Sequence, residues 1–266
     1  MEYKIRQLSF ADIFDQSLRI LVDNAVLLVG LATLYGIPSE ALPRGRGWPE
    51  LMRWAFLLFA APFPEAALAS AAADICLNRD CTVQAALKTA GSIYLAFMGT
   101  FLIVECVSLP GIGLLAIATV TKSHIGAAVS GIVAIAGIVL LAISIFFLIR
   151  WILYGPIMLV ERRFGPAALR RSSALLRGAW WRTFGIFAAV IVVELLPVRI
   201  FRVFWSSLPV VGTVLDGLIV SITYAYVSVL VTVYYFDRRC RLEDFDLRYL
   251  ADQIRADTVQ SPRMTQ

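Results

Sequence analysis

The run IGAAVSGIVAIAGIVLLAISIFFLI, residues 125–149, contains no charged side chain and decides the class of the fold. A helix rises about 1.5 Å per residue, so about 20 apolar residues cross the hydrocarbon core of a bilayer. This block continues beyond Arg150 to about residue 160, which makes it longer than one membrane thickness. We therefore expect its helix to tilt, protrude or break, and Gly155-Pro156 is the expected break.

Apolar blocks recur along the whole chain. Hydrophobic residues make up 59% and charged residues 16% of the 266 residues, whereas soluble domains average roughly 45–50% and about 25%. Six spans are predicted, at about residues 21–41, 51–77, 90–120, 125–160, 181–205 and 209–236. The predicted fold is an all-α polytopic membrane bundle that forms one six-helix transmembrane domain over residues 1–250. A short cytoplasmic tail is expected at 251–266.

The 24 Lys and Arg residues fall mostly on alternate connections between these spans. The exceptions are Arg44, Arg46, Arg53, Lys122, Arg199 and Arg202. Because basic residues in short loops are retained on the cytoplasmic face, both termini are predicted to be cytoplasmic.

A short amphipathic segment precedes each odd-numbered span, at residues 10–24, 82–90 and 165–182. In the third, an arginine side made of Arg170, Arg171 and Arg177 is expected to lie opposite an apolar side. We expect such segments to be interfacial helices along the inner leaflet. Each odd span also ends near a proline, at Pro38, Pro110 and Pro197. These features favour three tandem hairpin repeats; the alternative is that they recur in any protein built from hairpins.

The segments 165–197 and 234–250 carry a family resemblance. The last span closes with Tyr235, Asp237, Arg239, Arg241, Glu243, Asp244, Asp246 and Leu247. This order resembles the pattern Y-x-D-x-R-x-R-x-E-G-x-D-L of the bacterial family known as the membrane domain of glycerophosphoryl diester phosphodiesterase, with Asp244 at the glycine position. The resemblance implies a six-span protein of the bacterial cytoplasmic (inner) membrane without the catalytic domain. Phosphodiesterase chemistry needs metal-binding carboxylates and histidines, and the single histidine, His124, has no carboxylate cluster around it.

Ionisable residues inside the predicted spans are the first site candidates, because a charge in the hydrocarbon is costly and usually faces a partner or water. They are Glu65, Glu105, Arg150, Glu194 and Asp216. An outer ion-pair cluster is expected from Glu194, Arg199, Arg202 and Asp216. Two interpretations of the carboxyls remain open: neutral groups that hydrogen-bond across helices, or a pathway for protons or a polar solute. The second requires several carboxyls to face one cavity.

The basic inner face supplies the second set of candidates, for anionic lipid or a membrane or cytoplasmic protein partner. They are Arg162, Arg163, Arg170, Arg171, Arg177, Arg182, Asp237, Arg238, Arg239 and Arg241. The acidic residues after the last span are expected to pair with arginines of the 162–182 segment and hold the tail under the bundle. The net charge of +5 lines one membrane face and forms no basic domain, so no nucleic-acid partner is expected.

Sequence motifs of catalysis are absent: the chain has no Walker loop, dinucleotide fingerprint, HExxH or GxSxG. Gly111-Ile112-Gly113 is interpreted as a helix end, and Gly126, Gly131 and Gly137 as close-packing positions. No catalytic residue, metal or cofactor is predicted. The favoured function is a non-catalytic scaffold that binds lipid or a partner. The alternatives are a small transporter or channel that uses the intramembrane carboxylates and, third, a lipid-processing membrane enzyme.

Overall fold

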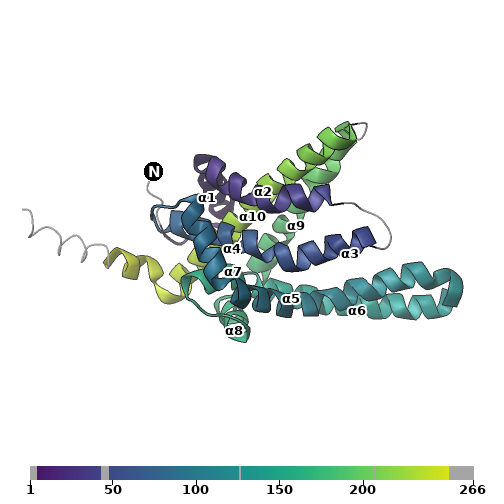
Figure 1. Ribbon diagram of the computed structural model, residues 1–266. Coiled ribbons are helices and arrows are strands. Elements are labelled where there is room, and N and C mark those ends of the chain that lie inside the picture. The colour runs from purple at the N-terminus through teal and green to yellow at the C-terminus, as the bar shows by residue number, and fades with distance from the viewer. Residues whose placement is uncertain (1–4, 43–47, 126, 206–207, 252–266) are drawn as a thin grey trace, which may run out of the picture.

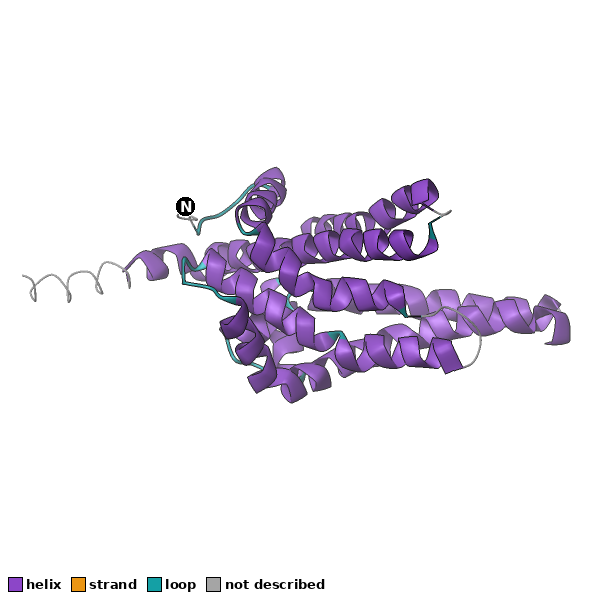
Figure 2. Ribbon diagram, turned by 45° about the horizontal axis from the view of Figure 1, so that its top comes forward, coloured by secondary structure: helices purple, strands orange, loops and turns teal. Residues whose placement is uncertain are grey.

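The structure is a computed structural model that describes residues 5–42, 48–125, 127–205 and 208–251, with backbone alone at 120–125, 127–128 and 209. All regular elements in these ranges are helices, as Figures 1 and 2 show, which confirms the all-α prediction. The expected tail lies outside the described residues apart from Ala251.

The helices follow one another in this order: α1 (Phe10–Asp23), α2 (Ala25–Ala41), α3 (Trp48–Ala55), a π-helical turn η1 (Phe56–Ala60), α4 (Pro62–Cys76), α5 (Val83–Ile125), α6 (Ala127–Trp151), α7 (Tyr154–Val160), α8 (Pro166–Leu175), α9 (Trp180–Trp205) and α10 (Pro209–Glu243).

Five helical segments of the described chain are long and apolar enough to cross a membrane: Trp48–Cys76, Val83–Thr119, Val129–Val160, Trp180–Trp205 and Val210–Glu243. A sixth exists if α1 and α2, which meet at 92°, are counted as one broken span. The predicted start of the first span at residue 21 is wrong, because α1 continues to Asp23. The side-chain amide of Asn24 donates a hydrogen bond to Ile20 O (3.0 Å) where α1 ends. The architecture fits a multi-pass membrane protein.

Two of the three expected interfacial segments are separate helices, α1 and α8. α1 begins with a capping box, in which Ser9 Oγ accepts from the Asp12 N–H and Asp12 Oδ2 accepts from the Ser9 N–H. The expectation for 82–90 is wrong, because these residues form the first turns of α5, with Thr82 Oγ1 accepting from the Ala85 N–H. The three expected hairpin repeats therefore differ in how the amphipathic segment joins its span. That the three hairpins superpose stays a prediction.

The prolines expected to end the odd spans lie inside helices instead, Pro38 in α2, Pro110 in α5 and Pro197 in α9. Proline removes one backbone hydrogen bond of the helix. In apolar surroundings no water is available to hydrogen-bond the neighbouring N–H and C=O groups, so these groups stay paired within the helix and the helix continues. α5 has 43 residues and is roughly 65 Å long at 1.5 Å per residue. The α5–α6 hairpin accordingly projects past the other helices in Figure 1.

Glycines bring α5 and α6 close together. A Cβ on Gly111 would lie 2.7 Å from Leu141 N, and one on Gly137 would lie 3.0 Å from Leu115 Cγ. The interpretation of residues 111–113 as a helix end is thus wrong, whereas Gly137 is a close-packing position as expected. A Cβ on Gly131 would meet no atom within 4 Å, so the expectation of close packing there is wrong, and Gly126 lies outside the described residues. The hairpin is therefore held by backbone proximity at a few specific positions.

The fourth apolar block breaks, as expected, but at residues 152–153 and not at Gly155-Pro156. The reason is a contact from α8. Ser172 Oγ donates to Arg150 O (2.9 Å) and accepts from the Leu153 N–H (3.3 Å), so one hydroxyl satisfies both sides of the break. Pro156 then lies in the first turn of α7, where its missing N–H has no partner to lose.

α4 is the centre of the bundle. Its alanine-rich sequence, PFPEAALASAAADIC, is buried over most of its length, and it packs on α2, α5, α7 and α10. Small side chains let helix backbones approach closely without polar penalty. The π-helical turn before α4 leaves Phe59 O available, and the hydroxyl of Tyr94 on α5 donates to it.

α2 packs most extensively against α10, more than against α4, although α4 is much nearer to it in sequence. The crossing is made by two glycines: a Cβ on Gly36 would lie 2.5 Å from Gly217 O and 2.7 Å from Ser221 N. Figures 1 and 2 show that the N-terminal segment and the end of the described C-terminal segment lie at the same end of the bundle.

Gly36→Ala should lower the melting temperature of the detergent-purified protein, because the new methyl group overpacks the α2–α10 crossing at a cost of about 1–3 kcal/mol. Gly30→Ala on the same helix is the matched control, since a Cβ there meets no atom within 4 Å. The control should be neutral or slightly stabilising, because alanine favours helix over glycine by roughly 0.5–1 kcal/mol. Thermal unfolding followed by circular dichroism measures both, and equal effects would contradict the close crossing.

Candidate functional site

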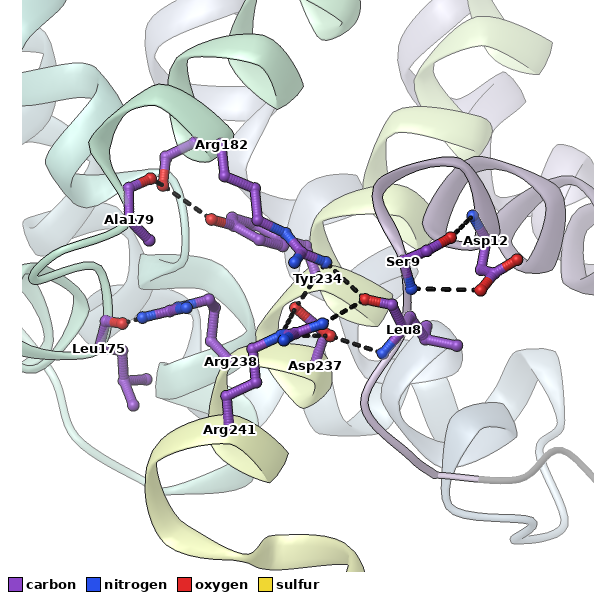
Figure 3. Close-up of polar contacts among 11 residues, drawn as sticks. Leu8, Ser9, Asp12, Leu175, Ala179, Arg182, Tyr234, Asp237, Arg238 and Arg241 are labelled. Atoms are coloured by element: carbon purple, nitrogen blue, oxygen red, sulfur yellow. Dashed lines mark hydrogen bonds and ion pairs between the residues drawn. The ribbon is translucent and has the colours of Figure 1, made fainter.

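A buried carboxylate organises the end of the bundle where the two chain ends meet. The Asp237 side chain on α10 is 0% exposed. It accepts from the Leu8 N–H (2.8 Å) and lies 3.1 Å from Arg182 Nη2 and 3.0 Å from Arg241 Nε, as Figure 3 shows. Both arginines also donate to Leu8 O. One carboxylate therefore joins the segment before α1, the first turn of α9 and the last turns of α10.

Two further contacts extend this end of α10. Arg238 is buried, and its Nε donates to Leu175 O at the end of α8 (2.9 Å). The Tyr234 hydroxyl lies 2.7 Å from Thr183 Oγ1 on α9, with either group able to donate. These contacts fix the connection between α8 and α9 against α10.

A second network is built around Glu161, which follows α7. Arg171 Nε donates to both Glu161 oxygens (3.0 and 2.8 Å), and the Tyr235 hydroxyl donates to Oε1 (3.1 Å). Arg171 also pairs with Glu243, which Arg239 Nε approaches at 3.0 Å. Burial lowers the pKa of Arg171, but the hydrogen bonds to Glu161 and Glu243 outweigh it and hold the pKa above its ordinary value. The network ties α7, α8 and the end of α10 together.

Most of the predicted inner-face residues are thus engaged within the protein. Arg171, Arg182, Asp237, Arg238, Arg239 and Arg241 belong to the two networks. The expected pairing between acidic residues after the last span and arginines of 162–182 is present in Glu243–Arg171. Asp237, which precedes these acidic residues, pairs with Arg182. Arg163 lies 3.3 Å from Glu161 and stays more than half exposed. Within the described ranges, Arg162, Arg170 and Arg177 have no carboxylate in ion-pair contact.

At the opposite end, Arg202 on α9 joins two acidic residues. Its Nε donates to Asp216 Oδ2 (2.8 Å) and its Nη2 to Glu40 Oε2 (2.7 Å), while Trp205 Nε1 donates to Asp216 Oδ1 (2.9 Å). The expected pairing of Arg202 with Asp216 is therefore present. The expected inclusion of Glu194 and Arg199 is wrong, because among the described residues no ion pair connects either of them to this cluster. Glu40 takes that place, brought there by the packing of α2 on α10.

Three of the five intramembrane candidates line one cavity. Glu65 from α4, Glu105 from α5 and Glu194 from α9 border a space of about 330 Å³, together with Tyr154 from α7 and Tyr224 from α10. The hydroxyl of Tyr154 donates to Glu65 Oε1 (2.5 Å). Ser108 Oγ donates to Glu105 Oε2 (3.2 Å). The remaining wall is mostly apolar, so the few polar groups are concentrated on one small volume.

Two neighbouring spaces share walls with this cavity. One of about 760 Å³ is bordered by Glu65, Glu105 and the π-helical turn. The other, of about 470 Å³, is bordered by Glu194, Arg53 and Arg202. Tyr224 lines all three spaces, and its ring stacks on Tyr35 with centroids 4.5 Å apart. The cavity thus continues toward the end of the bundle that contains Arg202.

The other two intramembrane candidates lie elsewhere. Asp216 belongs to the Arg202 cluster, and Arg150 lies at the end of α6 beside α8. No group of three or more His, Cys, Asp or Glu side chains that could hold a metal ion occurs in the described residues. What the acidic cavity can do therefore depends on the charge and hydrogen bonding of its carboxyls.

Fold and site define an α-helical multi-pass membrane protein with an acidic cavity between its helices. The chain belongs to the family described as Domain of unknown function (DUF8558), which it matches over residues 51–259. No curated protein and no solved structure matches the chain. The matched range begins within α3 and includes α4 to α10, and hence all three cavity carboxyls.

Several residues that complete these sites carry little signal in the sequence. Tyr154 and Tyr224 look like ordinary aromatic residues of apolar blocks, and nothing in the sequence marks the Leu8 backbone. Glu161 gives a partial signal. Its position directly after an apolar block, beside Arg162 and Arg163, is the available indication of an ion-paired helix terminus.

Asp237→Asn should strongly destabilise the protein, because the amide leaves Arg182 and Arg241 without their buried counter-charge. Breaking a buried pair from one side costs about 3–5 kcal/mol. Asp15→Asn is the matched control, since the Asp15–Arg19 pair is 61% and 73% exposed and such pairs contribute about 0–1 kcal/mol. Melting temperatures in detergent compare the two; an Asp237→Asn protein as stable as the control would contradict the role of this carboxylate.

Proposed function

We propose that this protein is a multi-pass protein of the bacterial cytoplasmic membrane that binds a small organic cation in its acidic cavity and serves its passage across the membrane. The single observation that carries the proposal is the convergence of Glu65, Glu105 and Glu194, from three different helices, on one cavity. If these carboxyls served only as structural hydrogen-bonding groups, they could have been placed in separate interfaces between helices. A shared cavity concentrates carboxyl groups where a solute has room.

The walls favour an organic cation over a hydrated metal ion. Phe101, Tyr154 and Tyr224 line the cavity beside the carboxyls. Aromatic faces attract ammonium groups through their quadrupole, by about 0.5–2 kcal/mol each. The apolar lining also accommodates the hydrocarbon part of such a solute and would stabilise a fully hydrated ion poorly.

The orientation of the protein in the membrane and its relation to a known family are parts of the same proposal. The arginine-rich end of the bundle, where both described chain ends meet, is assigned to the cytoplasm on the basis of the charge distribution. The motif from Tyr235 to Leu247 supports a common six-span fold for DUF8558 and the glycerophosphoryl diester phosphodiesterase membrane domain.

A scaffold that binds lipid or a protein partner is the second candidate function. The observation in its favour is the set of arginines on the inner face that have no described carboxylate in ion-pair contact, Arg162, Arg170 and Arg177. The six engaged residues of the same face support a structural role for most of the basic charge there.

Binding of benzyltrimethylammonium to the detergent-purified protein tests the cavity, with benzylsulfonate as an anionic analogue of similar size. We expect the cation to bind and the anion not to bind, in isothermal titration calorimetry. Glu105→Gln and Glu194→Gln should each weaken binding about tenfold, the equivalent of roughly 1.4 kcal/mol. Asp80→Asn, in an exposed turn between α4 and α5, should change nothing.

Uptake of the labelled cation into proteoliposomes then separates transport from binding. Loss of uptake in the glutamine variants, at an unchanged melting temperature, supports a pathway through the cavity. Equal binding of cation and anion, or wild-type affinity in both glutamine variants, would refute the proposal.

A further inference from the structure

Three arginines without a carboxylate partner in the described ranges converge on one groove. Arg150 lies in the last turn of α6, Arg170 lies on α8 and Arg177 follows α8; all three border a groove of about 690 Å³. A smaller space of about 190 Å³ beside it is also lined by Arg150 and Arg177. The hydroxyl of Ser172 on α8 donates to Arg150 O, so the two helices that carry these charges are held in contact.

The side chains of Arg170 and Arg171 point to different sides of α8. Successive residues of a helix point about 100° apart, so Arg171 faces Glu161 and Glu243 while Arg170 faces the groove. The expectation that these two arginines share one side of α8 is therefore wrong. The guanidinium carbon of Arg150 lies 5.6 Å from the centroid of the Phe146 ring, a contact that leaves its charge in place. The groove consequently carries uncompensated positive charge.

Convergent guanidinium groups are suited to phosphate, which they bind through several charge-assisted hydrogen bonds. The other wall of the groove is apolar, formed by Ile103, Phe147 and Trp151. Arg150 ends an uncharged run that begins at residue 125, which positions the groove at the boundary between hydrocarbon and headgroups. Trp180 lines the adjoining space and Trp181 is 80% exposed, as expected for tryptophans at a membrane interface.

We propose that this groove between α6 and α8 is a binding site for one anionic glycerophospholipid. The phosphate lies among Arg150, Arg170 and Arg177, the hydroxyl of Ser173 in the groove wall is a further donor, and an acyl chain follows Ile103 and Phe147 along α5 and α6. Charge complementarity and the adjoining apolar wall select a lipid over a soluble phosphate ester, because only a lipid uses both. The site shares no lining residue with the acidic cavity except Trp151 and does not depend on the function proposed for it.

Native mass spectrometry of the full chain in detergent, titrated with phosphatidylglycerol or phosphatidylcholine, tests the site. We expect phosphatidylglycerol to bind at least about tenfold more tightly. The double variant Arg170→Gln/Arg177→Gln should lower phosphatidylglycerol affinity about tenfold or more and leave phosphatidylcholine unaffected, because it removes two of the three guanidinium groups that attract an anionic headgroup.

Arg19→Gln/Arg79→Gln is the control, with the same change in net charge at two mostly exposed positions. It should retain the wild-type preference, and melting temperatures should show that both double variants are folded. Equal affinity for the two lipids, or an equal loss in the control, would overturn the proposal. Displacement of the lipid by an equal concentration of glycerophosphoglycerol would also overturn it, since a headgroup without chains would then be the occupant.

Discussion

The contacts that join the segment before α1 to α9 and α10 depend on the burial of the Asp237 carboxylate. A charge removed from water must be matched by charge and hydrogen bonds within the protein, and here these come from Arg182, Arg241 and the Leu8 N–H. Leu8 and Arg182 lie far from Asp237 in sequence. Because both contact its carboxylate, the segment before α1 and the start of α9 are held against α10. The Glu161 network repeats this arrangement for α7 and α8.

The position of α8 links these networks to the membrane-facing parts of the protein. Arg171 anchors α8 on one side through Glu161 and Glu243, and Ser172 anchors it to the break between α6 and α7. Arg170, on the remaining side, is directed into the groove that Arg150 also lines. The acidic cavity depends in a similar way on α4, whose small side chains let α5, α7 and α10 approach it and bring Tyr154 to Glu65.

Much of the helix pattern was predictable, because apolar length and the absence of charge are local properties. α9 (Trp180–Trp205) lies within one residue of the predicted span, and α10 begins at the predicted residue, 209. The predicted helix ends and breaks are wrong where contacts with another helix, and not the local sequence, determine the structure. Pro110 was expected near the end of its span, but α5 continues to Ile125, and α6 packs along it through Gly111 and Gly137. The break in the fourth block was expected at Gly155-Pro156, but Ser172, which no local pattern connects to it, determines the position.

The sequence by itself determined the all-α membrane class, the number of apolar blocks to within one, and the identity of the ionisable residues inside them, because hydropathy and charge are properties of the residues themselves. Only the tertiary structure decided which of these residues meet. Glu65, Glu105 and Glu194 share a cavity, Asp216 pairs with Arg202, which also holds Glu40, and Arg150 joins Arg170 and Arg177. The physical reason is that the partners of a side chain depend on how its helix is rotated and which helices it crosses. Glycine contacts and buried ion pairs between distant segments determine this rotation and crossing, and the periodicity of the sequence does not reveal them.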